Sequence, residues 1–225
     1  MKVTSLSNHP EQQRTLVQQK HAASRSGWNF WRRSYIPAVG QEERRLDAGI
    51  AGEENVADAL TVLSDEWHLF RGYRNRRGEI DHVLVGPGGI WAIEVKNTRA
   101  TVYVDGDYWA FERFDNYGNL VEEGELADRG GRSWSRQVNE PARELSKFLT
   151  KRNAYSTISS AVVLTNRRAK LGQCDALTVD VLSVGTDYLL NKISGVHGQQ
   201  LSREQVQTVA ALVQRDHTFH SQRRR

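Results

Sequence analysis

Hydrophobic positions fall into a regular pattern only after a long polar stretch at the start of the chain. Between residues 49 and 67, apolar side chains stand at Val56, Ala59, Leu60 and Leu63, at the offsets i, i+3, i+4 and i+7. These offsets mark one face of a helix. Residues 1–38 show no strong period. We therefore expect an amphipathic helix before residue 67 and assign residues 1–38 to an N-terminal arm.

Short apolar runs directly after this helix predict paired strands. Residues 67–74 are typical of a strand, and a basic turn follows them. The segments Ile80–Val85 and Ile90–Val95 are rich in Val and Ile and flank the turn Gly86–Gly89. Two such runs joined by a short glycine-containing turn predict a β-hairpin.

Helices separate the later strands. Residues 133–152 carry apolar side chains at helical offsets, interrupted by Pro141, which kinks the helix or starts a second one. The segments Ile158–Asn166 and Ala176–Val184 predict buried strands, whereas Leu120–Arg132 is acidic and glycine-rich and predicts a loop. A terminal helix is expected from residue 201, with Ser202 as its N-cap.

This order of elements predicts an α/β or mixed α+β domain with a central sheet. We place that domain at residues 39–200. A C-terminal helix and a basic tail, which ends in three arginines, occupy residues 201–225.

Charged side chains interrupt the predicted hairpin, and their register is informative. If Val85 faces Ile90, Asp81 faces Glu94 and Glu79 faces Lys96. Side chains alternate along a strand, so these four charged groups lie on one face. Directly opposed Cβ atoms are about 4.5–5.5 Å apart. The register therefore places two carboxylates side by side, with a lysine next to them.

Two carboxylates at that separation repel each other unless a cation or a proton lies between them. A divalent metal such as Mg²⁺ prefers oxygen ligands and binds one or two carboxylates. Lys96 would then orient or help deprotonate an attacking water and offset phosphate charge. The alternative is a purely structural hairpin that exposes an Asp–Lys pair.

Composition limits the remaining possibilities. The chain has a net charge of +4, and residues 1–40 hold six basic residues and one acidic residue. Such an arm suits a phosphate backbone or an acidic surface, or it is a solvated tail. Aromatic residues between 26 and 37 could stack on bases, although docking on the protein body is favoured. One cysteine, no secretory signal and no long apolar segment predict a cytoplasmic protein without a membrane partner.

The quoted motifs resemble those of one family. The spacing D-x12-E-V-K resembles the PD-(D/E)xK nuclease superfamily, and the stretch EIDHVLVGPGGIWAIEVKN resembles the nuclease-related (NERD) domain more narrowly. The segments GIAGEENVADAL and SRQVNEPARELSKFL resemble two helices of that domain. The resemblance covers residues 46–184. It implies a restriction-endonuclease-like core, with a mixed central β-sheet flanked by helices.

The resemblance also implies an activity and a set of site residues. The activity is metal-dependent phosphodiester hydrolysis, with Mg²⁺ or Mn²⁺ as cofactor and DNA favoured over RNA as substrate. By position, Asp81, Glu94 and Glu53 would be the acidic residues of the site, and Lys96 would be the catalytic lysine. The superfamily pattern adds the carbonyl of Val95 as a metal ligand. Gln137 would contact the substrate or the water, although Pro141 lies four residues after it.

Two further interpretations stay open. The basic turn before the hairpin contributes Arg74, Arg76 and Arg77, which could bind a phosphate backbone or form a solvated loop. The whole chain could be a nuclease-fold module that binds nucleic acid or a protein without cutting. A homodimer is also possible, because many nucleases of this fold cut duplexes as dimers.

Overall fold

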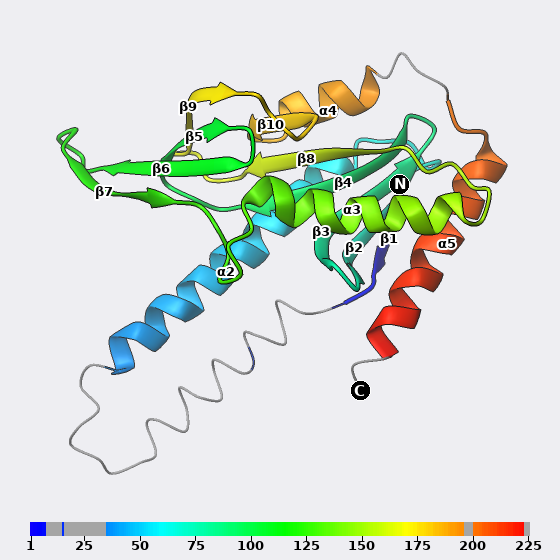
Figure 1. Cartoon of the computed structure of the whole chain (residues 1–225), viewed down its shortest axis with the longest axis horizontal. Coiled ribbons are helices and arrows are strands. Elements are labelled where there is room, and N and C mark those ends of the chain that lie inside the picture. Colours follow the sequence, from blue (N-terminus) through cyan, green and yellow to red (C-terminus); the bar gives the residue numbers. More distant parts are fainter. Residues whose placement is uncertain (8–14, 16–34, 196–199, 223–225) are drawn as a thin grey trace, which may run out of the picture.

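The computed structural model describes residues 1–7, 15, 35–195 and 200–222, with side chains from residue 44 onward in the first long helix. A six-stranded sheet forms the centre of the molecule (Figure 1). Its strand order is β1-β2-β3-β4-β8-β10. The bounds are Lys2–Ser5 for β1, His68–Asn75 for β2, Gly78–Gly86 for β3, Gly89–Lys96 for β4, Ile158–Leu164 for β8 and Val181–Val184 for β10.

The main sheet is mixed. Strands β2, β3 and β4 are antiparallel, whereas β1 runs parallel to β2, and β8 and β10 run parallel to β4. The predicted hairpin register is confirmed, because Val85 pairs with Ile90. A parallel β4–β8 pair needs a long crossover connection. The second sheet and a helix occupy that connection here.

In the part of the chain that the structure describes, four helices cover the main sheet. Their bounds are Tyr35–Leu60 for α2, Trp134–Thr150 for α3, Asp187–Ser194 for α4 and Arg203–Gln222 for α5. Helices α3 and α5 pack on one face through residues such as Leu145 and Val213 (Figure 1). Helices α2 and α4 pack on the other face through Leu60 and Leu189. The predicted α/β class, with a mixed central sheet flanked by helices, is confirmed.

A second sheet extends from one end of the molecule (Figure 1). Its order is β7-β6-β5-β9, with bounds Leu120–Glu125, Tyr108–Phe114, Thr101–Asp105 and Lys170–Asp175 respectively. The prediction of a loop over Leu120–Arg132 is therefore wrong for its first half. Every residue of β7 is exposed, so this strand has no alternating apolar face that the sequence could reveal.

Other boundaries also differ from the expected ones. Helix α2 begins at Tyr35, well before the first periodic apolar residue. Strand β1 was not expected; the amide of Lys2 donates to the carbonyl of Trp67 at 2.8 Å and begins the pairing with β2. The predicted strand over Ala176–Val184 is confined to Val181–Val184. The rest of the N-terminal arm at 8–14 and 16–34, with its Trp residues, and the terminal arginines lie outside the described residues.

The C-terminal helix has the expected start. The amide of Gln205 donates to Oγ of Ser202 at 3.2 Å, and the amide of Ser202 donates to Oε1 of Gln205 at 2.8 Å. This reciprocal pair is a capping box. The hydroxyl of Tyr73 on β2 donates to the buried carboxylate of Asp216, which ties α5 to the main sheet. No helix within the described ranges is long and apolar enough to cross a membrane.

Candidate active site

The β3–β4 hairpin brings Asp81 and Glu94 to the same end of the main sheet. Backbone pairing between β3 and β4 runs from Gly86–Gly89 to His82–Ile93, and the recorded pairs stop one position before Asp81. On the other side, β2 pairs with His82 and Ile80, with no recorded pair at Asp81. The backbone amide of Val95 instead donates to Oδ2 of Asp81 at 2.7 Å. Asp81 therefore lies where the pairing of β3 with β4 ends and where its pairing with β2 is interrupted for one residue.

The residue of β2 that faces Asp81 is a glycine. Gly72 stands in β2 opposite Asp81 and has a φ of +68°. A residue with a side chain rarely adopts this conformation. A Cβ at Gly72 would also lie 2.9 Å from the carbonyl oxygen of Ser7. The positive φ and the close approach of Ser7 thus both require glycine at position 72.

Lys96 lies at the end of β4 and binds two site residues. Its Nζ donates to Oε1 of Glu94 at 2.6 Å and to Oε1 of Gln137 at 2.9 Å. The same nitrogen lies 5.8 Å from the ring centre of Trp134, which is within cation–π range. The Glu94 side chain is buried and 6% exposed, so this ion pair is largely shielded from water.

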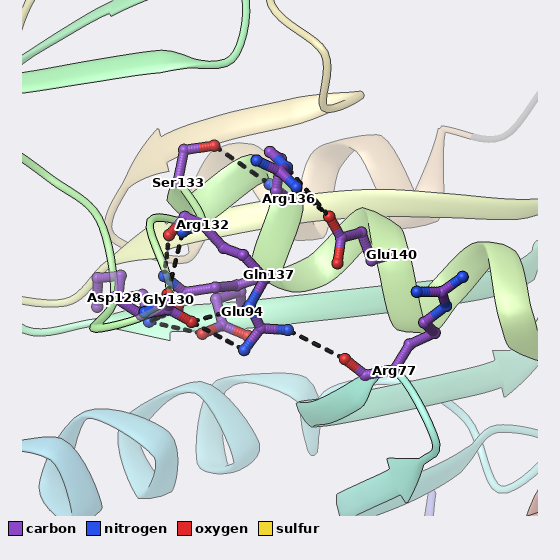
Figure 2. Close-up of polar contacts among 10 residues, drawn as sticks. Arg77, Glu94, Asp128, Gly130, Arg132, Ser133, Arg136, Gln137 and Glu140 are labelled. Atoms are coloured by element: carbon purple, nitrogen blue, oxygen red, sulfur yellow. Dashed lines mark hydrogen bonds and ion pairs between the residues drawn. The ribbon is translucent and has the colours of Figure 1, made fainter.

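Helix α3 supplies Gln137 from its first turns. Ser133 caps the helix by accepting a hydrogen bond from the amide of Arg136, and Nε2 of Gln137 donates to the carbonyl of Arg132 at 2.9 Å (Figure 2). Pro141 lies inside the helix and removes the N–H that would bond to the Gln137 carbonyl. The helix continues through it from Trp134 to Thr150, so no second helix starts at Pro141, and Gln137 reaches Lys96.

Helix α2 brings Glu53 to the opposite side of the same site. A close approach of the helix to the sheet makes this possible, because a Cβ on Gly52 would lie only 2.7 Å from Oγ1 of Thr165. The carbonyl of Glu53 lies 3.0 Å from Nε2 of His82, whose ring is fully buried beneath α2. Burial lowers the pKa of His82 to about 4, which keeps the ring neutral. His82 is therefore structural: it lies on the face of β3 that α2 covers and contacts the backbone of that helix.

The acidic side chains and Gln137 line one cleft of about 290 Å³, and Lys96 lies behind it in contact with Glu94 and Gln137. The cleft also receives two arginines that the sequence did not single out, Arg45 from α2 and Arg132 from the loop before α3. Figure 2 shows Arg132 beside Gln137 and Glu94, where its guanidinium binds Asp128 and the carbonyl of Arg77. No sequence spacing indicates this position, because it depends on how α3 packs against the hairpin. The site residues that line the cleft are Glu53, Asp81, Glu94 and Gln137.

The electrostatics of the cleft are dominated by its carboxylates. Burial raises the pKa of Glu53 to about 7, and Arg71 opposes this rise. The charges of Glu79 and Glu94 raise it further. Burial and the same kind of repulsion, from Glu94 and Glu53, hold the pKa of Asp81 well above its usual range. The cleft thus holds more negative charge than its own cations neutralise.

Lys96 responds in the opposite way. Burial alone would lower its pKa, but the charges of Glu94 and Asp81 outweigh this effect and raise the pKa above the usual value. Its carboxylate neighbours therefore favour the charged form of Lys96. In this form the ammonium donates hydrogen bonds and offsets negative charge.

Comparison with known proteins agrees with this geometry. The family model described as "NERD: Nuclease-related domain" matches residues 48–165, slightly more than half of the chain. The chain belongs to the NERD family. The match spans the end of α2, the hairpin and α3, so it includes all of the proposed site residues, and the superfamily assignment is consistent with it. Searches of curated proteins and of solved structures give no match.

The donor atoms of this NERD domain suit a hard divalent cation in kind, because they are carboxylate oxygens. Their arrangement does not form a complete set of metal ligands. Among the described residues, no group of three or more His, Cys, Asp or Glu side chains is placed to hold a metal ion. One oxygen of Asp81 accepts from Val95, and one of Glu94 accepts from Lys96. The other oxygen of each carboxylate is the one that could bind an ion.

The three arginines of the basic turn have different surroundings in the NERD domain. Arg74 forms an ion pair with Glu79 at 2.5 Å, and Arg76 forms one with Glu144 at 2.6 Å. Arg77 is exposed, and its backbone carbonyl accepts a hydrogen bond from the guanidinium of Arg132 (Figure 2). Glu79, which the register placed opposite Lys96, also accepts a hydrogen bond from Ser7 at 3.0 Å. Arg77 is thus the arginine of this turn that most freely faces solvent near the cleft.

Proposed function

We propose that this protein is a metal-dependent nuclease that hydrolyses phosphodiester bonds in DNA. One observation carries the proposal: the carboxylates of the hairpin line a single cleft with Glu53 of α2 and Gln137 of α3, and the ammonium of Lys96 binds two of these lining residues. Nuclease chemistry needs negative ligands for a cation, a positive group for the phosphate and a polar group to orient water. The cleft supplies all three from separate elements.

Each residue has a distinct task in this proposal. Asp81, Glu94 and Glu53, with the carbonyl of Val95, would hold Mg²⁺ or Mn²⁺. Such an ion, when bound, acidifies water and stabilises charge on the phosphoryl oxygens. The Lys96 ammonium offsets phosphate charge and orients the attacking water by hydrogen bonding. Gln137 fixes the position of that ammonium, because it is one of its two hydrogen-bond acceptors.

Burial of the acidic cluster supports a cation at this place. Glu53 and Asp81, whose burial and neighbouring charges disfavour ionisation, gain when a positive ion replaces their protons. Mg²⁺ and Mn²⁺ are favoured over Zn²⁺, because the described residues of the cleft offer oxygen donors and no thiolate or imidazole. We favour DNA over RNA as the substrate because of the family resemblance. We favour the cytoplasm as the location because of the sequence.

A cleavage assay tests the proposal. The full chain is incubated with supercoiled plasmid, linear duplex and single strands of DNA and of RNA, in Mg²⁺, Mn²⁺ or EDTA. We expect cleavage that requires the metal and is lost in Asp81→Asn. Metal-independent cleavage, or equal cleavage by the variant, would reject this site as the source of the activity.

One observation favours a second candidate function, a module that binds nucleic acid without cutting it. The Lys96 ammonium already neutralises Glu94 at 2.6 Å, so part of the acidic charge is balanced by the chain itself. If no substrate is cut in any metal while nucleic acid is still bound, the binding module replaces the nuclease.

A further inference from the structure

A second and larger hollow adjoins the acidic cleft. It has a volume of about 930 Å³ and lies between α2, the segment after β4, the second sheet and the turn after β8. Arg45 lines both hollows, so they are neighbours. We call this hollow the basic groove; its lining cations include Arg45, Arg99, Arg113, Arg167, Arg168 and Lys170.

The basic groove carries a clear excess of positive charge. Its acidic lining residues are Glu112 and Asp115. Glu112 accepts a hydrogen bond from Tyr103 at 2.5 Å, and Asp115 accepts from the side chain of Asn119 at 2.9 Å. Both carboxylates are thus engaged by neighbours within the second sheet. Their negative charges remain, but the arginines and the lysine of the lining outnumber them, so the groove is net positive.

Most of the groove cations face solvent. Arg99, Arg167, Arg168 and Lys170 are exposed, and within the described ranges none of these four forms an ion pair. Arg113 is paired with Glu122. Clustered like charges repel one another and lower stability. Such a cluster is therefore the expected footprint of a polyanion.

A chain of hydrogen bonds fixes the groove relative to the proposed catalytic lysine. Asn97, the residue after Lys96, donates from Nδ2 to the carbonyl of Ala48 on α2 at 2.9 Å. Asn166 donates from Nδ2 to Oδ1 of Asn97 at 2.8 Å, and the amide of Arg168 donates to Oδ1 of Asn166 at 3.0 Å. The turn that presents Arg167 and Arg168 is thus connected to the end of β4. A phosphate chain held by this turn would lie at a set position relative to the cleft.

An exposed aromatic side chain also lines the groove. Phe114 ends β6 and is 48% exposed, and the neighbouring lining residue Val121 is 61% exposed. Exposed apolar side chains on the wall of a basic groove make little contact with the bases of a duplex, because those bases are paired and stacked on one another. An unpaired base offers a better contact, because every base has a face that stacks on an aromatic ring.

We propose that the basic groove binds a single-stranded segment of nucleic acid next to the phosphate that enters the acidic cleft. The arginines and Lys170 contact the backbone, and Phe114 stacks on a base. This inference rests on the proposed nuclease function for its orientation toward the cleft. It assigns a substrate form, an unpaired strand at the cut site, and the surface that recognises it.

Fluorescence anisotropy of the full chain tests the groove. The probes are a fluorescein-labelled 20-nucleotide single strand and a 20-base-pair duplex, in EDTA so that binding is measured without metal-dependent cleavage. The variant Arg99→Ala/Arg168→Ala removes two cations from different walls. Its matched control, Arg203→Ala/Arg215→Ala, removes two exposed cations from α5. Unchanged melting temperatures confirm that each variant is folded.

We expect the groove variant to bind the single strand roughly tenfold more weakly. The slope of log K against log salt should also become shallower by about 1.4, because each of the two lost phosphate contacts contributes about 0.7. The control should match the wild type. Phe114→Ala should weaken binding of the single strand by about fivefold or more and leave duplex binding unchanged. Equal binding by the groove variant and the wild type, or equal loss of both probes in Phe114→Ala, would overturn the proposal.

The same samples separate this inference from the nuclease proposal. If the wild type cuts DNA but the groove variant binds and cuts normally, the groove is rejected and the nuclease stands. If the wild type binds single strands through the groove but cuts nothing in any metal, the nuclease is rejected and the groove stands.

Discussion

The ammonium of Lys96 donates a hydrogen bond to the side-chain carbonyl of Gln137 at 2.9 Å, across 41 residues of sequence. This contact connects the end of β4 with the first turns of α3. Through this hydrogen bond, the position of the Lys96 side chain depends on the position of α3. Its loss should affect the orientation of Lys96 before it affects the fold.

The first prediction therefore concerns Gln137→Ala. This change removes one of the two acceptors that position Lys96 and leaves Glu94 to hold it alone. We expect the cleavage rate at saturating metal to fall by about 10- to 100-fold, as for other groups that orient catalytic residues. Single-turnover cleavage of a labelled oligonucleotide measures this rate.

The matched control for this prediction is Arg136→Ala. Arg136 precedes Gln137 on α3, is exposed and pairs with Glu140 four residues along the helix. Because such surface pairs contribute little to stability, this variant should cleave at the wild-type rate. A similar loss of rate in both variants would show that Gln137 acts through helix stability.

The second prediction concerns pH and Glu53. Its pKa rises from 4.5 when unfolded to about 7 when folded, so the folded state binds the extra proton between these values. The stabilisation is complete below about pH 4.5 and is lost as the pH rises through about 7. Glu53→Gln, which carries no charge, should therefore raise the metal-free melting temperature at pH 8 and have little effect at pH 5.

Differential scanning fluorimetry of Glu53→Gln and of Glu54→Gln in EDTA provides the measurement. Glu54 is the adjacent residue of α2 and is exposed, so its substitution should shift the melting temperature little at either pH. A stabilisation of Glu53→Gln that is the same at pH 5 and pH 8 would contradict the charge repulsion on which the prediction rests.

The third prediction concerns metal binding without catalysis. A divalent ion offsets the repulsion among the three carboxylates of the cleft and must displace protons from Glu53 and Asp81, whose pKa values are raised. Mn²⁺ should therefore raise the melting temperature of the wild type more at pH 8 than at pH 5.5. In Asp81→Asn, most of this increase should disappear. Stabilisation by Mn²⁺ that persists unchanged in Asp81→Asn would place the ion elsewhere.

The fourth prediction concerns the close packing of α2 on the sheet. A Cβ at Gly52 would lie 2.7 Å from the buried Oγ1 of Thr165, whereas a Cβ at Gly49 has no atom within 4 Å. We expect Gly52→Ala to lower the free energy of unfolding by about 1–3 kcal/mol through overpacking. Gly49→Ala in the same helix should raise it by about 0.5–1 kcal/mol. Urea unfolding measures both.

A double variant separates the clash from other effects at this position. Thr165→Ala removes the hydroxyl that the new Cβ would meet. Gly52→Ala/Thr165→Ala should therefore be more stable than the two separate losses predict. Strict additivity would show that the approach of α2 does not limit the size of residue 52.

The hairpin was the part of the site that sequence could predict best. Its register follows from two apolar runs joined by a short turn, and the observed pair Val85–Ile90 confirms it. Once the register is known, Asp81 and Glu94 necessarily approach each other. Glu53 and Gln137 could be placed there only through family resemblance, because no local periodicity relates separate helices to a strand end.

Other features depended on tertiary packing that the sequence does not encode locally. Strand β7 is exposed along its whole length and so lacks the alternation that identifies half-buried strands. The Asn97–Asn166 hydrogen bond joins the ends of two parallel strands that are 69 residues apart in sequence. Arg45 reaches the cleft because α2 crosses the sheet at Gly52. Each of these depends on the arrangement of complete elements.

The central claim is that Lys96 and its carboxylate neighbours form a metal-dependent catalytic site. The most direct test is the rate at which Lys96→Ala cuts DNA in saturating Mn²⁺, measured beside the wild type and Arg136→Ala with melting temperatures recorded for all three. We predict metal-dependent cutting by the wild type and by Arg136→Ala, and a loss of about 100-fold or more in folded Lys96→Ala. Cutting by folded Lys96→Ala at the wild-type rate would contradict the claim.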